Sequence, residues 1–350
     1  MARNPYVVEY AELPAWAQDN AYIQTGYRRP GDAPRKGGDD ASRLYHDSFY
    51  QCWRSVWNYW HNETMNIHTH LFGAVVALGL LTLVFLDIAG VLPSGPWDAF
   101  LVCRGAGTGV ARLISAILGA GAGRALSPPD WADVVGLAVF LVAAVTCLVC
   151  SATYHTFSCH SLAVSKSFNR LDYVGIVVMI VGSNIPALHY SFYCRRDLQA
   201  AYVAVVVALG TVALNLVVRP VYATPRYRPV RAGVFVALGL TGAVPVFHGM
   251  YLYGHTFVLH TLNGKYIALS GALYIAGAAL YVMHVPERFS PRTFDLVGSS
   301  HQIFHVCVLA AAACHYHAVR SAYQFWHALD AATGSVGTGA VCHAVQKGWV

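Results

Sequence analysis

The stretch Phe294–Val319, "FDLVGSSHQIFHVCVLAAAACHYHAV", decides the fold of this chain. From Leu296 to Val319 it contains no charged residue, and a helix of that length matches the ~30 Å hydrocarbon core of a bilayer. Yet it carries four histidines, and polar side chains are costly inside hydrocarbon. The stretch therefore predicts a membrane-spanning helix whose histidines need partners elsewhere in the chain.

Similar apolar stretches recur along the sequence. Of the 350 residues, 56% are apolar and only 11% are charged, against about 25% charged in ordinary soluble domains. Seven uncharged stretches are long enough for a helix of about 20 residues. We therefore expect an all-α polytopic membrane protein, a seven-transmembrane helix bundle, with spans near 67–89, 131–154, 172–193, 199–218, 231–251, 266–284 and 298–319.

The basic residues predict the orientation of these spans. Fifteen of the 23 Lys and Arg residues lie on the side of the N-terminus, and eight lie on the opposite side. Because basic loops are retained in the cytosol, we expect a cytosolic N-terminus and an outside C-terminus. The net charge of +6 is spread over these loops, which indicates contact with membrane lipid and no nucleic acid. The expected location is integral and multi-pass, in the plasma membrane or an endomembrane.

Four regions are expected along the chain. The first is a flexible cytosolic arm, because its Pro, Gly and charged residues cannot bury a core. The second is an aromatic, amphipathic segment at the inner membrane interface. A seven-helix membrane domain with a Gly/Ala-rich insert in an outer loop follows, and then an outer tail. Their bounds are 1–43, 44–66, 67–320 (insert about 103–127) and 321–350.

The nine cysteines do not have the pattern of a secreted disulfide framework. Most lie in or near the expected spans. Cys147 and Cys150 stand in the middle of one span, and we interpret them as packing thiols, since a thiol behaves as a small apolar group.

A possible site lies at the inner ends of three spans. His301 and His305 are four residues apart, so both project from one helical face and could bind one metal ion. His155 ends the second span at the same depth, with Ser151 one turn deeper. Asp172 opens the third span there, and a carboxylate at that depth is costly unless it is paired or used. Three histidines and a carboxylate that holds a water are the layout of a catalytic zinc site.

Each of these residues has a simpler interpretation as well. A lone histidine in a helix is usually a packing residue that forms hydrogen bonds. Ser151 could bond to the carbonyl one turn earlier, and Asp172 could be a helix N-cap. The shared depth of all five residues favours a site over packing. His315 and His317 lie roughly 15 Å further along the last span by helical rise, and we expect them at the outer interface.

Three motifs carry a family resemblance: "NETMNIHTHLFG" (62–73), "SATYHTFSCHS" followed by "FNRLDYVGI" (151–176), and "PERFSPRTFDLVGSSHQIFH" (286–305). In this order they resemble the progestin and adipoQ receptor family, which contains adiponectin receptors, haemolysin III-like proteins and fungal zinc-homeostasis and osmotin-receptor proteins. With the seven spans, the resemblance covers about residues 45–320. "SATYHT" and "SHQIFH" are most similar to the fungal and adiponectin-receptor members.

The resemblance implies a seven-helix bundle with a cytosolic N-terminus and a zinc ion held by the residues that match His155, His301 and His305. It also implies that Asp172 holds a water on the metal, with Ser151 close by. The expected role is that of a receptor or sensor in lipid and zinc homeostasis. The expected partners are membrane lipid, a lipid or sphingolipid substrate and an extracellular protein ligand. A wider superfamily that includes alkaline ceramidases shares the pattern, and some relatives are thought to hydrolyse lipid amides such as ceramide.

The sequence leaves the activity open between several hypotheses. In a zinc-dependent lipid amidohydrolase, Asp172 would be the general base and Ser151 would stabilise the developing oxyanion. In a non-catalytic receptor the zinc would be a structural tie, although three ligands and a water differ from the closed shell of structural zinc. A transporter or channel would need charged residues across the bilayer, which the spans lack. The remaining hypothesis is packing histidines without a metal.

Overall fold

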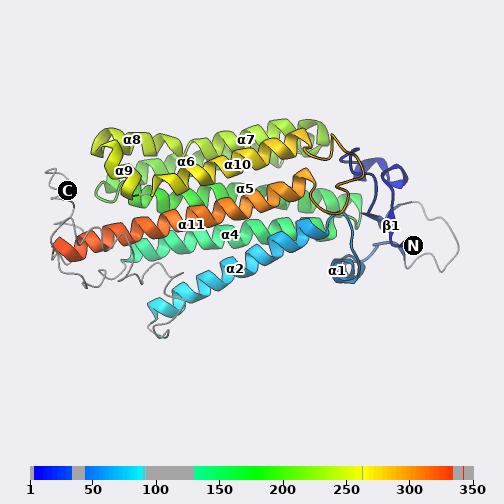
Figure 1. The fold of residues 1–350 in the computed structure, drawn as a ribbon, viewed down its shortest axis with the longest axis horizontal. Helices are drawn as coiled ribbons and strands as arrows, with labels where there is room; N and C mark the ends of the chain where they lie inside the picture. The colour runs from blue at the N-terminus through cyan, green and yellow to red at the C-terminus, as the bar shows by residue number, and fades with distance from the viewer. Residues whose placement is uncertain are drawn as a thin grey trace.

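The computed structural model is an elongated bundle of helices, with the N-terminal segment folded across one end (Figure 1). The structure describes residues 4–33, 44–89, 91, 130–261, 263–333 and 342. Within these ranges, seven helical segments are long and apolar enough to cross a membrane. The predicted all-α, seven-span architecture is therefore confirmed. The spans are α2 (Thr64–Ile88), α4 (Trp131–Phe157), α5 (Leu162–Ser191), α6 (Arg196–Val217), α7 with α8 (Arg228–Leu240 and Ala243–Tyr253), α10 (Gly264–Met283) and α11 (Ser300–Thr333).

The fifth span differs from the single helix that the sequence predicts. It is divided into α7 and α8, which meet at Thr241 and Gly242. Pro245 lies in the first turn of α8, where its missing N–H is tolerated, whereas inside a continuous helix it would remove a backbone hydrogen bond. A short helix, α9 (His255–Thr261), follows between the expected fifth and sixth spans.

Helices α4 and α5 pack closely along their length (Figure 1). Small residues allow this approach: a Cβ atom on Gly175 would lie 2.9 Å from the Cα of Cys147, and one on Gly182 would lie 2.5 Å from the Cβ of Ala143. The Asp130 carboxylate caps the start of α4 by accepting hydrogen bonds from the N–H groups of Ala132 and Asp133. The pair forms the rigid side of the bundle on which the site is built.

Residues 4–33 differ from the expectation of a flexible arm. Strand β1 (Val7–Val8) pairs antiparallel with β2 (Tyr27–Arg28), and two 3₁₀ turns lie between them, η1 (Tyr10–Glu12) and η2 (Ala15–Ala17). Side chains bind the segment to the end of the bundle that the basic residues predict to be cytosolic, which we call the inner end. Thr25 donates to the Asp295 carboxylate from its N–H (2.8 Å) and its hydroxyl (2.6 Å), and Asp19 forms an ion pair with Arg228. Residues 34–43 of the expected arm lie outside the described part of the chain.

Helix α1 (Phe49–Asn58) follows this segment at the same end of the bundle (Figure 1). The Ser48 hydroxyl caps it by accepting a hydrogen bond from the N–H of Gln51. One face buries Cys52 and Val56, and the opposite face exposes several aromatic rings, among them Trp53 and Trp57. This amphipathic arrangement suits a helix at a membrane surface. Its location at the inner interface stays a prediction.

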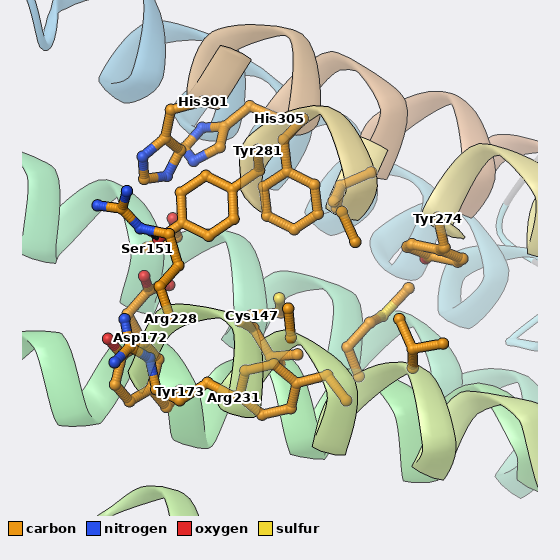
Figure 2. Close-up of a pocket in the computed structure, with 18 of the residues that line it drawn as sticks. Cys147, Ser151, Asp172, Tyr173, Arg228, Arg231, Tyr274, Tyr281, His301 and His305 are labelled. Atoms are coloured by element: carbon orange, nitrogen blue, oxygen red, sulfur yellow. Dashed lines mark hydrogen bonds between the residues drawn. The ribbon is translucent and has the colours of Figure 1, made fainter. Parts of the chain in front are cut away.

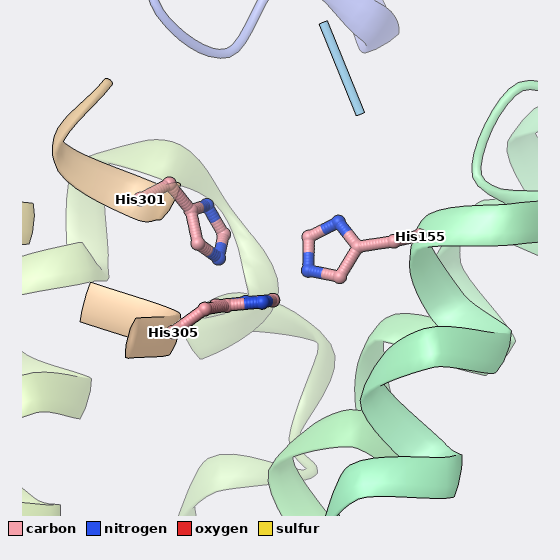
Figure 3. Close-up of side chains that lie close together, drawn as sticks. All are labelled: His155, His301 and His305. Carbon is pink, nitrogen blue, oxygen red and sulfur yellow. The ribbon is translucent and has the colours of Figure 1, made fainter. Parts of the chain in front are cut away.

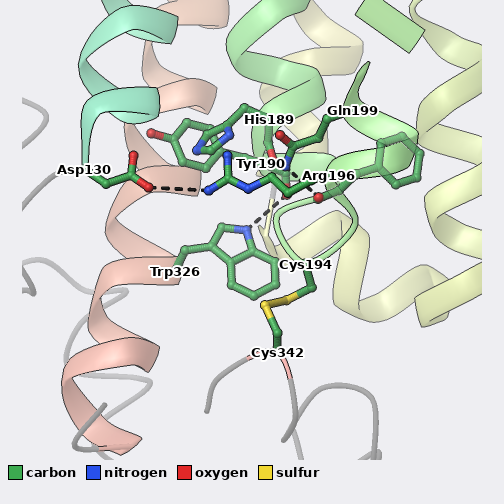
Figure 4. The surroundings of a disulfide bond; sticks show 9 residues. Asp130, His189, Tyr190, Cys194, Arg196, Gln199, Trp326 and Cys342 are labelled. Atoms are coloured by element: carbon green, nitrogen blue, oxygen red, sulfur yellow. Dashed lines mark hydrogen bonds and ion pairs between the residues drawn. A yellow bond between two sulfur atoms is a disulfide. The ribbon is translucent and has the colours of Figure 1, made fainter. Parts of the chain in front are cut away.

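The opposite end contains two features that the sequence did not predict. Helix α11 continues to Thr333, so the first part of the expected tail is helical. A disulfide joins Cys194, between α5 and α6, to Cys342 in the tail (Figure 4). The two cysteines are 148 residues apart, and nothing in the local sequence signals their pairing. The predicted insert at about 103–127 lies outside the described residues.

A buried carboxylate joins three spans near the disulfide. Asp133 of α4 is 4% exposed and accepts hydrogen bonds from His189 (3.2 Å) and Tyr190 (2.8 Å) of α5. It also accepts one from His327 of α11 at 3.0 Å. Buried charges in membrane proteins require such partners. This cluster joins the helices at the opposite end of the bundle, which we call the outer end, independently of the histidines at the inner end.

Candidate metal centre

Three histidines converge at the inner end of the bundle, from two helices (Figure 3). His155 lies in the last turn of α4, and His301 and His305 lie on consecutive turns at the start of α11. One ring nitrogen from each lies within 4.8 Å of the others. Glu287 holds the first residue of α11 in place: the N–H of Ser300 donates to its fully buried carboxylate at 2.8 Å. The structure thus brings together the three residues that the sequence proposes as metal ligands.

Hydrogen bonds orient two of these rings. The Nδ1 of His155 lies 2.7 Å from a carboxylate oxygen of Glu63, and the Nδ1 of His305 lies 3.1 Å from the carbonyl oxygen of Asn66. Both partners accept, so each Nδ1 carries a proton and each Nε2 presents a lone pair. The Nε2 of His155 is buried and has no hydrogen-bond partner. A buried acceptor without a partner is unfavourable by about 1–3 kcal/mol, whereas a metal ion would satisfy it, so the residues fit a metal.

Glu63 is the residue that positions His155. It immediately precedes α2, and its carboxylate also accepts a hydrogen bond of 2.7 Å from the side chain of Asn66. Burial opposes the charge of Glu63, but the hydrogen bonds from His155 and Asn66 help to hold the pKa of Glu63 well below its usual range. A carboxylate behind a ligating histidine is the usual support of a metal site.

Asp172 and Ser151 lie beside this cluster and not within it. Both are buried and line the same cavity as the three histidines (Figure 2). Neither belongs to the group of ligand atoms within 4.8 Å of one another. Asp172 does not open its span as expected, because α5 begins at Leu162 with Ser161 as its N-cap. It lies one turn before Gly175, whose close contact with Cys147 of α4 brings this part of α5 near α4. This placement suits side chains that act on water or substrate, and their catalytic roles stay predictions.

The cavity extends from the histidines into the apolar interior. Its volume is about 1160 Å³, and its walls come from α2, α4, α5 and α7 to α11, with part of the N-terminal segment. Arg228 and Tyr281 line it near the histidines (Figure 2), whereas Val258 and Leu259 line it toward the outer end. A polar inner end and a long apolar remainder are suited to an amphiphile with a chain.

His315 does not lie at the outer interface as predicted. Its Nε2 lies 2.9 Å from the carbonyl oxygen of Ser183 in α5, and the side chain lines the cavity. A packing role within the bundle explains it, because a polar ring inside a membrane protein needs a backbone partner. His317 is separate from the three inner histidines and packs its ring against Tyr266, with ring centroids 4.3 Å apart.

Two residues of α2 complete the surroundings and received no role from the sequence. Asn66 contacts both Glu63 and His305, as described above. His70 stacks on His305 with ring centroids 3.6 Å apart and an angle of 5° between the planes. The available signal was the spacing of three and four residues between Glu63, Asn66 and His70, which places them on one helical face. That spacing indicates a shared face but not what the face contacts.

A second group of possible ligands lies at the outer end: Asp130, Asp133 and His189. Here hydrogen bonds account for the arrangement without an ion. The Asp130 carboxylate caps α4, and Asp133 accepts from two histidines and a tyrosine. Among the described residues, the inner histidines are therefore the better metal site.

Fold and site together define a seven-helix membrane protein with a largely buried three-histidine centre. The family model described as haemolysin-III related matches residues 58–316, and the chain belongs to this family. An adiponectin receptor protein of Drosophila melanogaster is 34% identical over 89% of this chain and 59% of its own length. The ADIPOR-like receptor IZH2 of Saccharomyces cerevisiae is 29% identical over 90% of this chain and 84% of its own. The heptahelical transmembrane protein ADIPOR2 of rice is 46% identical over 52% of this chain and 79% of its own.

These matches agree with the resemblance that the three motifs indicate. The chain is an adiponectin-receptor-like, multi-pass membrane protein. It spans about three fifths of the length of the fly relative and of a similar Caenorhabditis elegans protein, a progestin and adipoQ receptor-like protein.

Proposed function

We propose that the protein holds a zinc ion within the membrane near the cytosolic face and acts as a receptor or sensor in lipid and zinc homeostasis. Its activity would be the zinc-dependent hydrolysis of a lipid amide such as ceramide. One observation carries this proposal: three imidazoles, of which His155 and His305 are buried and His301 is half-buried, converge at the polar end of an apolar cavity of about 1160 Å³. The receptor names of the fly and yeast relatives support the sensing role.

Zinc is the ion that suits this ligand set best. Neutral imidazoles are preferred zinc ligands, and three of them leave the open position typical of a catalytic site. The ligands would be His155, His301 and His305. A zinc ion held by them would supply Lewis acidity toward water and toward an amide carbonyl oxygen.

The remaining steps would belong to side chains of this chain. Asp172 would accept a proton from the attacking water and pass it to the leaving amine. Ser151 would donate a hydrogen bond to the oxyanion that develops on the carbonyl oxygen. The apolar part of the cavity would bind the acyl chain and exclude bulk water from the reacting atoms.

Ceramide hydrolysis by the purified protein tests the catalytic part. We expect fatty acid release by the wild type, loss of release in His305→Ala and after chelation, and recovery when zinc is restored to the chelated wild type. Asp172→Asn should keep its zinc and lose hydrolysis, which separates catalysis from folding. Equal turnover by wild type, His305→Ala and chelated protein would exclude the proposed hydrolase.

A non-catalytic receptor, in which zinc ties two helices together, is the second candidate. The histidines come from α4 and α11, so one ion would join two spans. An extracellular protein would then be the ligand. If this candidate is correct, wild type and Asp172→Asn respond equally to that ligand and neither releases fatty acid.

A further inference from the structure

Two free thiols face one another at the inner end of the bundle. Cys52 lies in α1 and Cys159 follows the end of α4, 107 residues further on, and their sulfur atoms are 3.7 Å apart. Cys52 is fully buried and Cys159 is 8% exposed. Because the sulfur atoms of a disulfide are about 2.05 Å apart, these two atoms are in contact but not bonded.

A buried cation belongs to the same cluster. Arg28 is 3% exposed and donates to the carbonyl oxygens of Thr156 (2.7 Å) and His155 (2.5 Å), and to the hydroxyl of Ser55 (3.1 Å). Its Nε–H is buried and has no hydrogen-bond partner. Burial by itself would raise the pKa of the Cys159 thiol, but the contact with Cys52 and the charge of Arg28 lower it. The surroundings therefore favour a thiolate on Cys159, the form that reacts with oxidants.

Cys159 is also within reach of small molecules. It lines the large cavity, as does Arg28. Cys147 lines the same cavity from the middle of α4, so exposure to the cavity is not particular to Cys159. What distinguishes Cys159 is the second thiol at 3.7 Å and the neighbouring arginine.

We propose that Cys52 and Cys159 form a dithiol–disulfide site that is oxidised by a hydroperoxide. The Cys159 thiolate attacks one oxygen of the hydroperoxide and breaks the O–O bond, which gives a sulfenic acid on Cys159. When the oxidant is hydrogen peroxide, the leaving hydroxide takes up a proton and becomes one water. The Cys52 sulfur then attacks the sulfenic sulfur, loses its proton and displaces a second water. In total the two thiols lose two electrons and two protons, and the peroxide accepts the electrons and the protons.

The disulfide would fasten α1 to the segment just beyond α4. Cys159 is four residues after His155, and Arg28 already binds the backbone between them. Oxidation would thus link the interfacial helix covalently to the element that carries one histidine of the inner cluster. The site is separate from Cys194–Cys342, which lies just beyond the end of α5 (Figure 4).

Peptide mass spectrometry of the full-length protein tests this inference. The reduced protein in detergent, freed of reductant, is treated with hydrogen peroxide, alkylated and digested. We expect a linked peptide pair containing Cys52 and Cys159, lighter by two hydrogens than the separate peptides and separated again by dithiothreitol. The pair should form equally in Cys147→Ser, the matched control for a thiol that lines the cavity.

Two further variants make the result specific. In Cys52→Ser, oxidation of Cys159 should stop at the sulfenic acid, which dimedone traps. In Cys159→Ser, Cys52 should remain a thiol. The inference is overturned if the wild type gives no Cys52–Cys159 peptide pair under peroxide, or if the pair forms only after the protein is unfolded in denaturant.

Discussion

Single residues around the three histidines determine which nitrogen atoms face the centre of the cluster. The Glu63 carboxylate accepts a hydrogen bond from Nδ1 of His155, and the Asn66 carbonyl accepts one from Nδ1 of His305. Both partners belong to the first turns of α2 or directly precede them. The motif "NETMN" (62–66) therefore has two roles: it begins a span, and it orients two candidate ligands from other spans.

The role of Glu63 can be measured through metal affinity. Glu63→Gln removes the charge but keeps the size, so His155 loses its strongest orienting acceptor. We expect zinc affinity to fall about 10- to 100-fold, measured by competition with a chromophoric chelator. Asp197→Asn, a carboxylate-to-amide change at an exposed position in α6, is the control and should bind zinc as the wild type does. Unchanged affinity in Glu63→Gln would mean that the carboxylate does not support a metal ligand.

The residues of the cluster were predictable because their spacing is local. His301 and His305 share a face by helical geometry, and His155 follows from the depth at which its span ends. Asp172 was expected at the start of its span, but α5 begins ten residues earlier, at Leu162. The support from Glu63 and the stacking of His70 depend on how α2 packs against α4 and α11. That packing is a property of tertiary structure, so the sequence indicated the face of α2 but not its partners.

At the scale of elements, the close packing of α4 and α5 places Asp172 near Ser151 and His155. Gly175 is decisive, since a Cβ atom there would lie 2.9 Å from backbone of α4. Backbone atoms cannot move aside as the end of a flexible side chain can. The distance between the two helices at the level of the cluster therefore depends on the absence of a side chain at this position.

Gly175→Ala should lower stability, and Gly271→Ala is a matched control. Both exchanges gain similar helix propensity, but a Cβ atom on Gly271 of α10 meets no atom within 4 Å. We expect Gly175→Ala to cost about 1–3 kcal/mol from overpacking and Gly271→Ala to be neutral or stabilising. The measurement is the midpoint of unfolding in detergent. If both variants are equally stable, the close contact between α4 and α5 is not as described.

The sequence predicted best those helices that can be recognised from the length of an apolar stretch alone. The seven spans follow from uncharged stretches of about 20 residues. The sequence did not predict three features: the division of α7 from α8, the folded structure of residues 4–33, and the extension of α11 to Thr333. The structure of residues 4–33 and the extension of α11 depend on contacts between distant residues, such as Asp19 with Arg228 and Trp326 with the carbonyl oxygen of Tyr190. A polar, Pro-containing segment resembles a flexible arm until the partners of its side chains are known.

At the scale of the whole molecule, the two ends of the bundle differ in sulfur chemistry. The end with the three histidines carries free thiols, including Cys52 and Cys159. The other end carries the disulfide Cys194–Cys342 and the buried Asp133 cluster. Disulfides persist in oxidising compartments and thiols in the reducing cytosol. This difference supports the orientation that the basic residues predict, with the N-terminus in the cytosol.

The orientation can be tested with added glycosylation sites. An acceptor sequence fused after the C-terminus should be glycosylated during membrane insertion, and one fused before the N-terminus should not be. The measurement is a shift in gel mobility that an endoglycosidase reverses, with the untagged chain as control. Glycosylation of the N-terminal fusion alone would reverse the orientation and place the three histidines on the outer side.

Zinc content tests the central claim most directly. The wild-type protein, purified without chelators, should contain about one equivalent of zinc by elemental analysis, as expected of a single three-histidine site. His155→Ala, His301→Ala and His305→Ala should each lose most of it, whereas His315→Ala, which changes a histidine on the same helix α11 outside the cluster, should retain it. Less than about half an equivalent in the wild type, or full retention in all three variants of the cluster, would contradict the metal centre and leave the histidines as packing residues.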